Sequence, residues 1–261
     1  MLRSLRQYRH FVISSIKNEL KSRFARSKLG GLWMLINPLA QVLIYALILS
    51  NVLAAKLPGI DNKYAYAIYL MAGLLAWNLF SEIVSRCLTL FIEQGNLLKK
   101  MSFPRITLPT IVVGSCLLNN VLLFIAMLGV FLVLGHQFSW VMLWLIPLTF
   151  IVVILAIGIG LTLGIINVFL RDIGQAFPIF LQVWFWFTPI VYPVNIIPES
   201  YRELLRLNPM YSITDAYHQI LVYGKPPLMG DIAIISIIAL GLMLLSLFLF
   251  RRASPEMVDA L

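Results

Sequence analysis

The chain has 261 residues, of which 61% are hydrophobic and only 12% are charged. Soluble domains carry roughly twice that charged fraction, so the composition excludes an ordinary soluble protein and indicates an integral membrane domain. The formal net charge of +9 does not indicate nucleic-acid binding, because most of the basic residues flank apolar runs. In that position they set the topology and contact lipid headgroups.

Residues 1–30 form a basic segment ahead of the first apolar run, with eight Lys or Arg residues and one acidic residue, Glu19. Apolar side chains recur in it at steps of three or four, at Leu5, Tyr8, Val12, Ile16, Leu20 and Phe24. This spacing places them on one helical face and predicts an amphipathic helix that lies in the membrane interface. A signal peptide is the alternative, but the basic region is too long for one.

Six apolar runs are long enough to cross a membrane, since each crossing needs about 20 mainly apolar residues. They cover residues 32–53, 64–90, 106–134, 141–170, 175–192 and 232–250, and the fifth is short and ends at Pro193. We therefore predict an all-α membrane protein with a single domain over residues 1–261. Its parts are an N-terminal segment (1–30), five spans (32–192), an external segment (193–230), a sixth span (232–250) and a tail (251–261).

The basic residues are distributed unevenly between the two sides of this arrangement. Lys and Arg number 14 in the N-terminal segment, the loops after the second and fourth spans and the C-terminal tail. The opposite side has five, and the remaining basic residue, Arg86, falls within the second span. The positive-inside rule therefore predicts that both termini are cytoplasmic.

The external segment, residues 193–230, contains too many apolar residues for a solvated loop. Asn208–Pro209 lies in its middle, and this dipeptide favours a break between two helices. We expect two short helices that dip back into the membrane or pack on its outer mouth, where buried irregular backbone is tolerated. The alternative is a small external cap without a role in transport.

No residue pattern in the chain predicts catalysis. The histidines His10, His136 and His218 fall in three separate segments, and no HExxH, GxSxG or CxxC pattern occurs. Cys87 and Cys116 lie in predicted spans and are expected to be inert buried thiols. A GxxxxGK[ST] phosphate loop is also missing from the sequence. If ATP and Mg²⁺ drive this protein, a separate subunit must bind them, and we expect no catalytic residue, metal site or cofactor in this chain.

Several residues within the spans are suited to helix packing. Glu82 and Arg86 lie four residues apart on one face of the second span and can pair. A self-neutralising pair that orients the helix is the favoured interpretation, and a functional charge is the alternative. Gly158, Gly160 and Gly164 in the fourth span include a GxxxG pattern, which lets helix backbones approach closely.

The fifth span carries a dense aromatic cluster: Trp184, Phe185, Trp186, Phe187 and Tyr192. Such residues are commonly anchors at the membrane interface. Aromatic rings are also suited to stacking on the apolar faces of sugar rings. Position alone does not separate these two interpretations.

The loop after the second span begins EQGNLLKKMSFPR at Glu93. Its polar start, its basic pair and Pro104 predict a short cytoplasmic helix followed by a break. A helix in this place could receive force from a soluble motor, and an ordinary basic loop is the alternative.

Three stretches, in order along the chain, resemble the ABC-2 type permeases that export polysaccharides. They are RSKLGGLWMLINPL (Arg26–Leu39), LLKKMSFPRITLP (Leu97–Pro109) and the stretch that runs from FLRDIGQAFPIF to VYG (Phe169–Gly224). Each is weak alone, but the combination covers almost the whole chain and is specific. Within that family the chain is most similar to O-antigen (lipopolysaccharide) exporter permeases, and capsule and teichoic-acid permeases are near relatives.

The resemblance implies a six-span subunit of a bacterial inner-membrane exporter. Two copies would form a homodimer with a channel between them, and two separate ATPase subunits would dock on its cytoplasmic face. The substrate would be a polysaccharide on an undecaprenyl pyrophosphate carrier. Residues 198–207 and 214–223 would form two helices of an external gate. An ABC-2 permease for drugs or lipids and an integral-membrane enzyme are the alternatives, although the chain lacks the acidic DxD pattern of the latter.

The resemblance also implies roles for individual residues. The residues expected to line the channel are Trp184, Trp186, Phe187 and Tyr192. Those expected at the cytoplasmic gate, near the pyrophosphate, are Arg23, Arg26 and Lys28, with contact to lipid headgroups as the alternative. Those expected to couple the chain to the ATPase are Glu93, Asn96, Leu97, Lys99 and Lys100.

Overall fold

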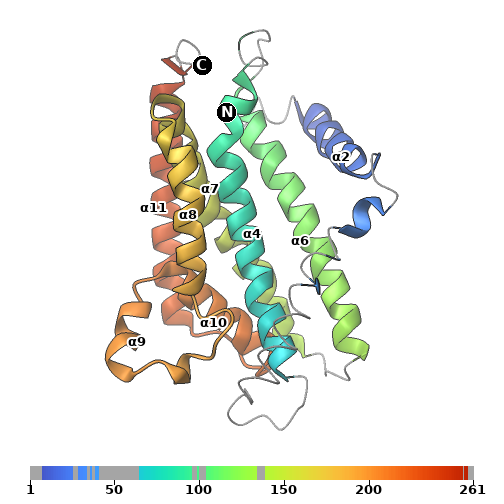
Figure 1. The fold of residues 1–261 in the computed structure, drawn as a ribbon, viewed down its shortest axis with the longest axis vertical. Helices are drawn as coiled ribbons and strands as arrows, with labels where there is room; N and C mark the ends of the chain where they lie inside the picture. The colour runs from blue at the N-terminus through green and yellow to red at the C-terminus, as the bar shows by residue number, and fades with distance from the viewer. Residues whose placement is uncertain are drawn as a thin grey trace.

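A computed structural model describes residues 8–25, 29–33, 36, 39–40, 65–95, 99, 104–133, 139–254 and 256–257. All the regular secondary structure in this part of the chain is helical. The elements are α2 (Arg9–Ala25), η1 (Gly30–Leu32), α4 (Ala65–Glu93), α6 (Thr107–Val133), η2 (Trp140–Trp144), α7 (Leu145–Phe169), α8 (Asp172–Trp186), η3 (Val194–Ile196), α9 (Glu199–Leu205), α10 (Pro209–Leu221) and α11 (Met229–Ala253). The long helices run side by side, and α2 lies next to α6 (Figure 1). Helices α9 and α10 lie at the end of the bundle away from the C-terminal end of α11.

Four helical runs in the described residues are long and apolar enough to cross a membrane: Ala65–Glu93, Thr107–Leu132, Trp140–Phe169 and Met229–Ala253. They correspond to the second, third, fourth and sixth spans expected from the sequence. The first expected span, residues 32–53, lies almost entirely outside the described residues.

The fifth expected span, residues 175–192, has different boundaries in the structure. Helix α8 begins at Asp172 and ends at Trp186. Its 15 residues extend about 22 Å, less than the roughly 30 Å of a hydrocarbon core. The helix ends before the predicted residue because Pro189 has no N–H to donate and disfavours helical geometry at Thr188.

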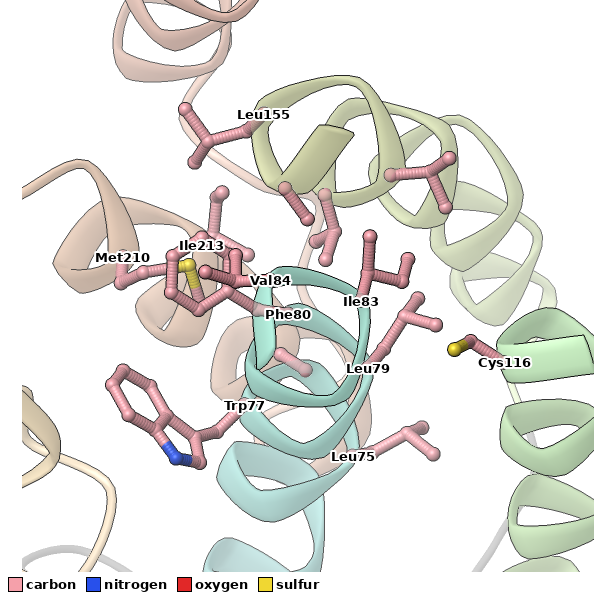
Figure 2. Packing of buried hydrophobic residues seen from close by; sticks show 14 of the residues in the cluster. Leu75, Trp77, Leu79, Phe80, Ile83, Val84, Cys116, Leu155, Met210 and Ile213 are labelled. Carbon is pink, nitrogen blue, oxygen red and sulfur yellow. The ribbon is translucent and has the colours of Figure 1, made fainter. Parts of the chain in front are cut away.

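Helix α4 is the central element and packs against α6, α7, α8 and α10. Figure 2 shows Phe80 and Val84 beside Met210 and Ile213 of α10, while Cys116 of α6 lies on the other side of α4. Nearly all apolar side chains of α4 are buried, and in a membrane their close van der Waals packing stabilises the helix bundle.

Glycines allow α7 to approach its two neighbours. A Cβ atom added at Gly160 would lie 2.9 Å from Cys87 Cβ of α4, and one added at Gly164 would overlap the Cys87 backbone carbonyl. One added at Gly158 would lie 2.9 Å from the Leu242 backbone of α11. The predicted close packing at these glycines therefore occurs between helices of the same chain.

One end of the bundle carries Arg105, Arg171, Arg251 and Arg252, and we call it the basic end. Arg105 donates hydrogen bonds to the Ser254 carbonyl oxygen and, at 2.6 Å, to Ser254 Oγ, which ties the start of α6 to the end of α11.

A buried Asn167 also stabilises the basic end. Its Nδ2 donates to the Leu88 carbonyl oxygen of α4 at 2.9 Å. Its Oδ1 accepts from the Gly174 N–H at 2.8 Å. This one side chain therefore holds the turn between α7 and α8 against α4.

At the opposite end, α9 and α10 lie on either side of Asn208. The Asn208 side chain caps α10 by accepting from Met210 N at 3.0 Å, and Pro209 begins the helix. The cap makes α10 start at residue 209, whereas the resemblance implied a helix over residues 214–223. One face of α10 is buried against the bundle, and α9 is largely exposed.

Candidate functional site

A groove of about 500 Å³ runs between α4 and α8. We call it the α4–α8 groove. Its lining residues are Leu74, Trp77, Asn78, Ser81, Ser85, Pro178, Leu181, Gln182, Phe185 and Trp186. Three aromatic rings thus face the same space as two amides and two hydroxyls. This set is uncharged and can offer both apolar ring faces and hydrogen-bond donors and acceptors to a hydroxyl-rich ligand.

Trp184, a predicted channel residue, does not line the groove. A hydrogen bond and several ring contacts hold its side chain in place. Its Nε1 donates to Asn208 Oδ1 at 2.8 Å. Its ring packs edge-on against Phe80 and Trp77 of α4, with centroid separations of 5.1 and 6.2 Å. Trp184 therefore holds α8 against α4 and the start of α10.

Sequence reasoning missed the role of Asn208 in this arrangement. Besides accepting from Trp184, Asn208 donates through Nδ2 to Thr188 Oγ1 at 3.0 Å. In the sequence, the Asn208–Pro209 pair indicates the start of a helix. It carries no information about the contact with the fifth span.

The other predicted channel residues lie at the end of α8. Trp186 lines the α4–α8 groove and its side chain is 56% exposed, and Phe187 is 64% exposed. Tyr192 is half-buried and its hydroxyl donates to the Trp186 carbonyl oxygen at 2.6 Å. The structure thus brings Trp186 into the groove beside Trp77, a residue that the sequence did not single out. The channel role of Trp186, Phe187 and Tyr192 stays a prediction.

A second cavity of about 480 Å³ lies between α2, α4 and α6. We call it the α2 cavity. Its lining residues are Phe11, Ser15, Glu19, Ser85, Arg86, Thr89, Leu90, Glu93, Gln94, Leu108, Ile111 and Val112. It is nearer the basic end than the groove, because its α4 residues are the later ones along that helix.

An ionic cluster borders the α2 cavity. Arg86 Nη2 lies 2.6 Å from Glu19 Oε1, and Arg86 Nη1 lies 3.9 Å from Glu82 Oε1. The predicted Glu82–Arg86 pair is therefore within ion-pair range, but the shorter contact comes from Glu19 on α2. Sequence spacing within one helix did not indicate that partner.

The two carboxylates of this cluster have further partners on α6. Ser115 Oγ donates to Glu19 Oε2 at 2.7 Å. Asn119 Nδ2 donates to Glu82 Oε1, also at 2.7 Å. The cluster thus joins α2, α4 and α6 through polar groups. The surrounding region is apolar, so a polar group that loses its partner there is costly in free energy.

The N-terminal helix packs against α6 in addition to forming these polar contacts. Val12 is buried, and Ile16 Cδ1 lies against Gly114, where an added Cβ would overlap it. Phe11 and Ile13 are 43% and 50% exposed, so the apolar residues of α2 are not confined to the buried face. Its predicted position in the membrane interface stays a prediction.

The predicted gate and coupling residues are only partly described. The Arg23 side chain, Arg26, Lys28, Asn96, Leu97 and Lys100 lie outside the described residues. Glu93 and Lys99 are exposed, and Glu93 also borders the α2 cavity.

Among the described residues, no group of three or more His, Cys, Asp or Glu side chains could hold a metal ion. Cys87 and Cys116 are both buried. His218 on α10 stacks on Tyr69 with a centroid separation of 3.6 Å, and its Nε2 lies 3.1 Å from the Tyr69 carbonyl oxygen. Burial lowers the pKa of His218 to about 3, so the ring is neutral at physiological pH.

Comparison with known proteins agrees with this membrane architecture. The ABC-2 type transporter family matches residues 11–222. The O-antigen export system permease protein RfbA of Myxococcus xanthus is 31% identical over 100% of this chain and 99% of that protein. The protein of the same name from Klebsiella pneumoniae is 30% identical over 79% of this chain and 78% of its own length.

A more distant likeness extends to a polysialic acid transport protein. The polysialic acid transport protein KpsM of Escherichia coli is 24% identical over 93% of both chains. The family match covers most of the chain, and the described helices are long and apolar enough for several crossings. This chain is a multi-pass membrane protein that belongs to the ABC-2 type transporter family.

Proposed function

We propose that the chain is the permease subunit of an ABC exporter that moves an O-antigen type polysaccharide outward across the bacterial inner membrane. The observation that carries this proposal is the α4–α8 groove, where aromatic rings and uncharged hydrogen-bonding groups face one space between two long helices. The full-length similarity to an O-antigen export permease supports the same substrate class.

The chemistry of the groove suits a chain that must move rather than bind tightly. The ring faces of Trp77 and Trp186 can stack on the apolar faces of sugar rings, while Asn78 and Gln182 exchange hydrogen bonds with sugar hydroxyls. A net hydrogen bond in water is worth only about 1 kcal/mol, so each sugar unit can leave as the next one arrives. The direction of movement must come from a coupled energy source.

We infer that this energy comes from a separate ATPase, because the sequence has no phosphate loop of its own. Two ATPase subunits would bind ATP and Mg²⁺ and dock through the N-terminal segment and residues 93–100. The residues expected at this contact are Glu93, Asn96, Leu97, Lys99 and Lys100. The basic end would then face the cytoplasm, as would both termini.

A homodimer with six spans per subunit would complete the channel. Residues 32–53 and α8 would supply the first and fifth spans beside the four long apolar runs. The exposed aromatic side chains of Trp186 and Phe187 at the end of α8 would face the channel between the two copies. On the external side, α9 and α10 would form the outer gate.

The polysaccharide would arrive on an undecaprenyl pyrophosphate carrier in the inner leaflet. Arg23, Arg26 and Lys28 would meet the pyrophosphate there, since basic side chains near the cytoplasmic leaflet attract phosphate groups. A capsular polymer is the second candidate substrate, favoured by the similarity to KpsM along most of both chains.

Deletion of the gene in its host, with complementation by the wild-type copy, tests this function. We expect the deletion to remove the polysaccharide from the cell surface and to leave lipid-linked polymer inside, measured by blotting of surface and cytoplasmic-membrane fractions. The polymer that disappears identifies O-antigen or capsule as the substrate. An unchanged surface glycan profile would overturn the proposal.

A further inference from the structure

Helix α4 carries one partly exposed stripe, and that stripe is entirely polar. Between Ile68 and Phe91 every residue is buried except six, and these six are Asn78, Ser81, Glu82, Ser85, Arg86 and Thr89. Steps of three and four place them on one helical face, which we call the polar stripe. In the part of the chain that the structure describes, this is the one face of α4 between Ile68 and Phe91 that is not fully buried, and its polar side chains are suited to contact with water or a polar ligand rather than with lipid.

The polar stripe connects the two cavities. Asn78, Ser81 and Ser85 line the α4–α8 groove, and Ser85, Arg86 and Thr89 line the α2 cavity. Ser85 belongs to both linings. With Glu93 at the side of the basic end, this face of α4 extends about 22 Å from the basic end to the middle of the bundle.

Hydrocarbon does not solvate a stripe of this kind. A charged or amide side chain in a membrane helix faces the protein interior or a water-filled space, because contact with lipid tails leaves its hydrogen bonds unmade. We propose that the polar stripe of α4 is one wall of a continuous, water-filled track that leads the polysaccharide from the α2 cavity into the α4–α8 groove. This inference rests on the function proposed above.

Four uncharged residues of the stripe make the contacts with the sugar chain: Asn78, Ser81, Ser85 and Thr89. Their amide and hydroxyl groups both donate and accept, so they match sugar hydroxyls in any orientation. Successive residues of this set are about 4.5 to 6 Å apart along the helix axis, which is close to the length of one sugar unit. The polysaccharide can therefore advance from one of these side chains to the next without a large change in the number of its hydrogen bonds.

The charges along the track select an uncharged polymer. Arg86 is paired with Glu19 and Glu82, and the described lining of the α2 cavity carries two carboxylates, Glu19 and Glu93, against this one arginine. The surplus negative charge in the described lining of the α2 cavity would repel a polymer with a carboxylate on every unit. The track accordingly takes neutral glycans in preference to polyanionic ones.

Accessibility of introduced cysteines to a charged thiol reagent tests the track. The complex in nanodiscs, with both faces open, is treated with methanethiosulfonate ethylammonium after Ser85→Cys or Leu244→Cys. Leu244 on α11 is 68% exposed and lies at a similar depth from the basic end, so it is a matched lipid-facing control. The wild-type chain, whose two cysteines are buried, supplies the background.

We expect Ser85→Cys to react at least about tenfold faster than Leu244→Cys, because a thiolate forms only in contact with water. Millimolar maltoheptaose should slow the reaction of Ser85→Cys at least about twofold, and a sialic acid heptamer should not. Equal rates at the two positions would overturn the track. A failure of maltoheptaose to slow the reaction, or equal protection by both oligosaccharides, would overturn the sugar contacts or the charge selection respectively.

Export in cells provides the functional arm. Ser85→Trp should reduce surface glycan at least about tenfold, whereas Leu244→Trp, the matched control for bulk, should change it less than twofold. If Ser85→Trp fails to reach the membrane, modification of Ser85→Cys by the thiol reagent replaces it. Normal export by a bulky or modified residue 85 would overturn the track.

The two proposals fail in different ways. If wild-type chain restores no glycan export to the deletion strain, the proposed function is wrong, whatever the labelling rates are. If wild-type chain restores export but Ser85→Cys reacts no faster than Leu244→Cys, the function stands and the track is wrong.

Discussion

At the scale of single residues, Asn208 shows how one amide can organise several elements. It caps α10 through Met210 N, accepts from Trp184 Nε1 of α8 and donates to Thr188 Oγ1. Asn has both a carbonyl and an amino group, so it can serve donors and an acceptor together. The aromatic cluster of α8 is thereby fixed relative to the gate helices proposed above.

Asn208→Ala should lower the stability of the protein by about 2 kcal/mol, because it removes a helix cap and leaves the Trp184 N–H without its acceptor. Thermal unfolding in detergent, followed by fluorescence-detected size exclusion, measures the change. Asn195→Ala, at an exposed position in η3, is the matched control and should be neutral. Equal transition temperatures for the two variants would contradict the role of Asn208.

At the scale of elements, α7 and α4 pack where two glycines of α7 meet the backbone and side chains of α4. In a membrane no hydrophobic effect drives helices together, so close van der Waals contact between backbones contributes more of the association energy. Gly164 faces the Cys87 carbonyl, so no larger side chain fits there without moving the helix.

Gly164→Ala should destabilise the protein by more than about 2 kcal/mol, although alanine is intrinsically the better helix former by about 1 kcal/mol. Gly241→Ala on α11 is the matched control, since an added Cβ there meets nothing within 4 Å. It should be neutral or slightly stabilising in the same thermal assay. A neutral Gly164→Ala would show that α4 and α7 are not in contact at this position.

Helix α2 is attached to the bundle by the ionic cluster and by a small apolar contact with α6. Glu19→Gln should weaken the attachment, because hydrogen bonds to charged groups contribute about 1.5–3 kcal/mol when well buried and less at the quarter exposure of this pair. Amide hydrogen exchange in residues 9–25 should accelerate roughly fivefold. Lys17→Gln, two residues earlier and exposed, should leave the exchange unchanged, and equal effects of the two variants would contradict this role.

At the scale of the whole molecule, Arg105, Arg171, Arg251 and Arg252 lie at one end of the bundle, and α9 and α10 lie at the other (Figure 1), where η2 contacts α10. Two contacts, Arg105 with Ser254 and Asn167 with Leu88, bring segments far apart in the sequence together at the basic end. This arrangement agrees with the loop assignment made from charge, and the side of the membrane on which that end lies is a prediction of the positive-inside rule.

Labelling of spheroplasts with an impermeant maleimide measures that orientation. Lys225→Cys, in the exposed turn before α11, should react without permeabilisation. Lys99→Cys, just after α4, should react only after detergent is added. The reverse pattern would show that the basic end faces outward.

The helical class, four of the described runs, the glycine packing and the lack of a nucleotide-binding motif follow from the sequence. Composition, segment length and the i, i+4 spacing are local properties, so no folded structure is needed to recognise them. The fifth expected span extends to Tyr192, beyond the end of α8 at Trp186, because the apolar run continues past Pro189 and hydropathy does not register the helix-breaking effect of proline.

Only the tertiary structure decided which of the suggestive residues share a space. Trp184 and Trp186 are two positions apart, yet one is anchored to Asn208 and the other lines the α4–α8 groove with Trp77. Glu19 meets Arg86 across 67 positions of sequence. Pairings at such separations depend on how whole helices dock, and the packing that docks them in a membrane is a sum of many small contacts between segments far apart in the sequence. Local sequence pattern therefore predicts that the chain is a helical membrane protein, whereas its groove, its ionic cluster and its polar stripe are properties of the packed bundle.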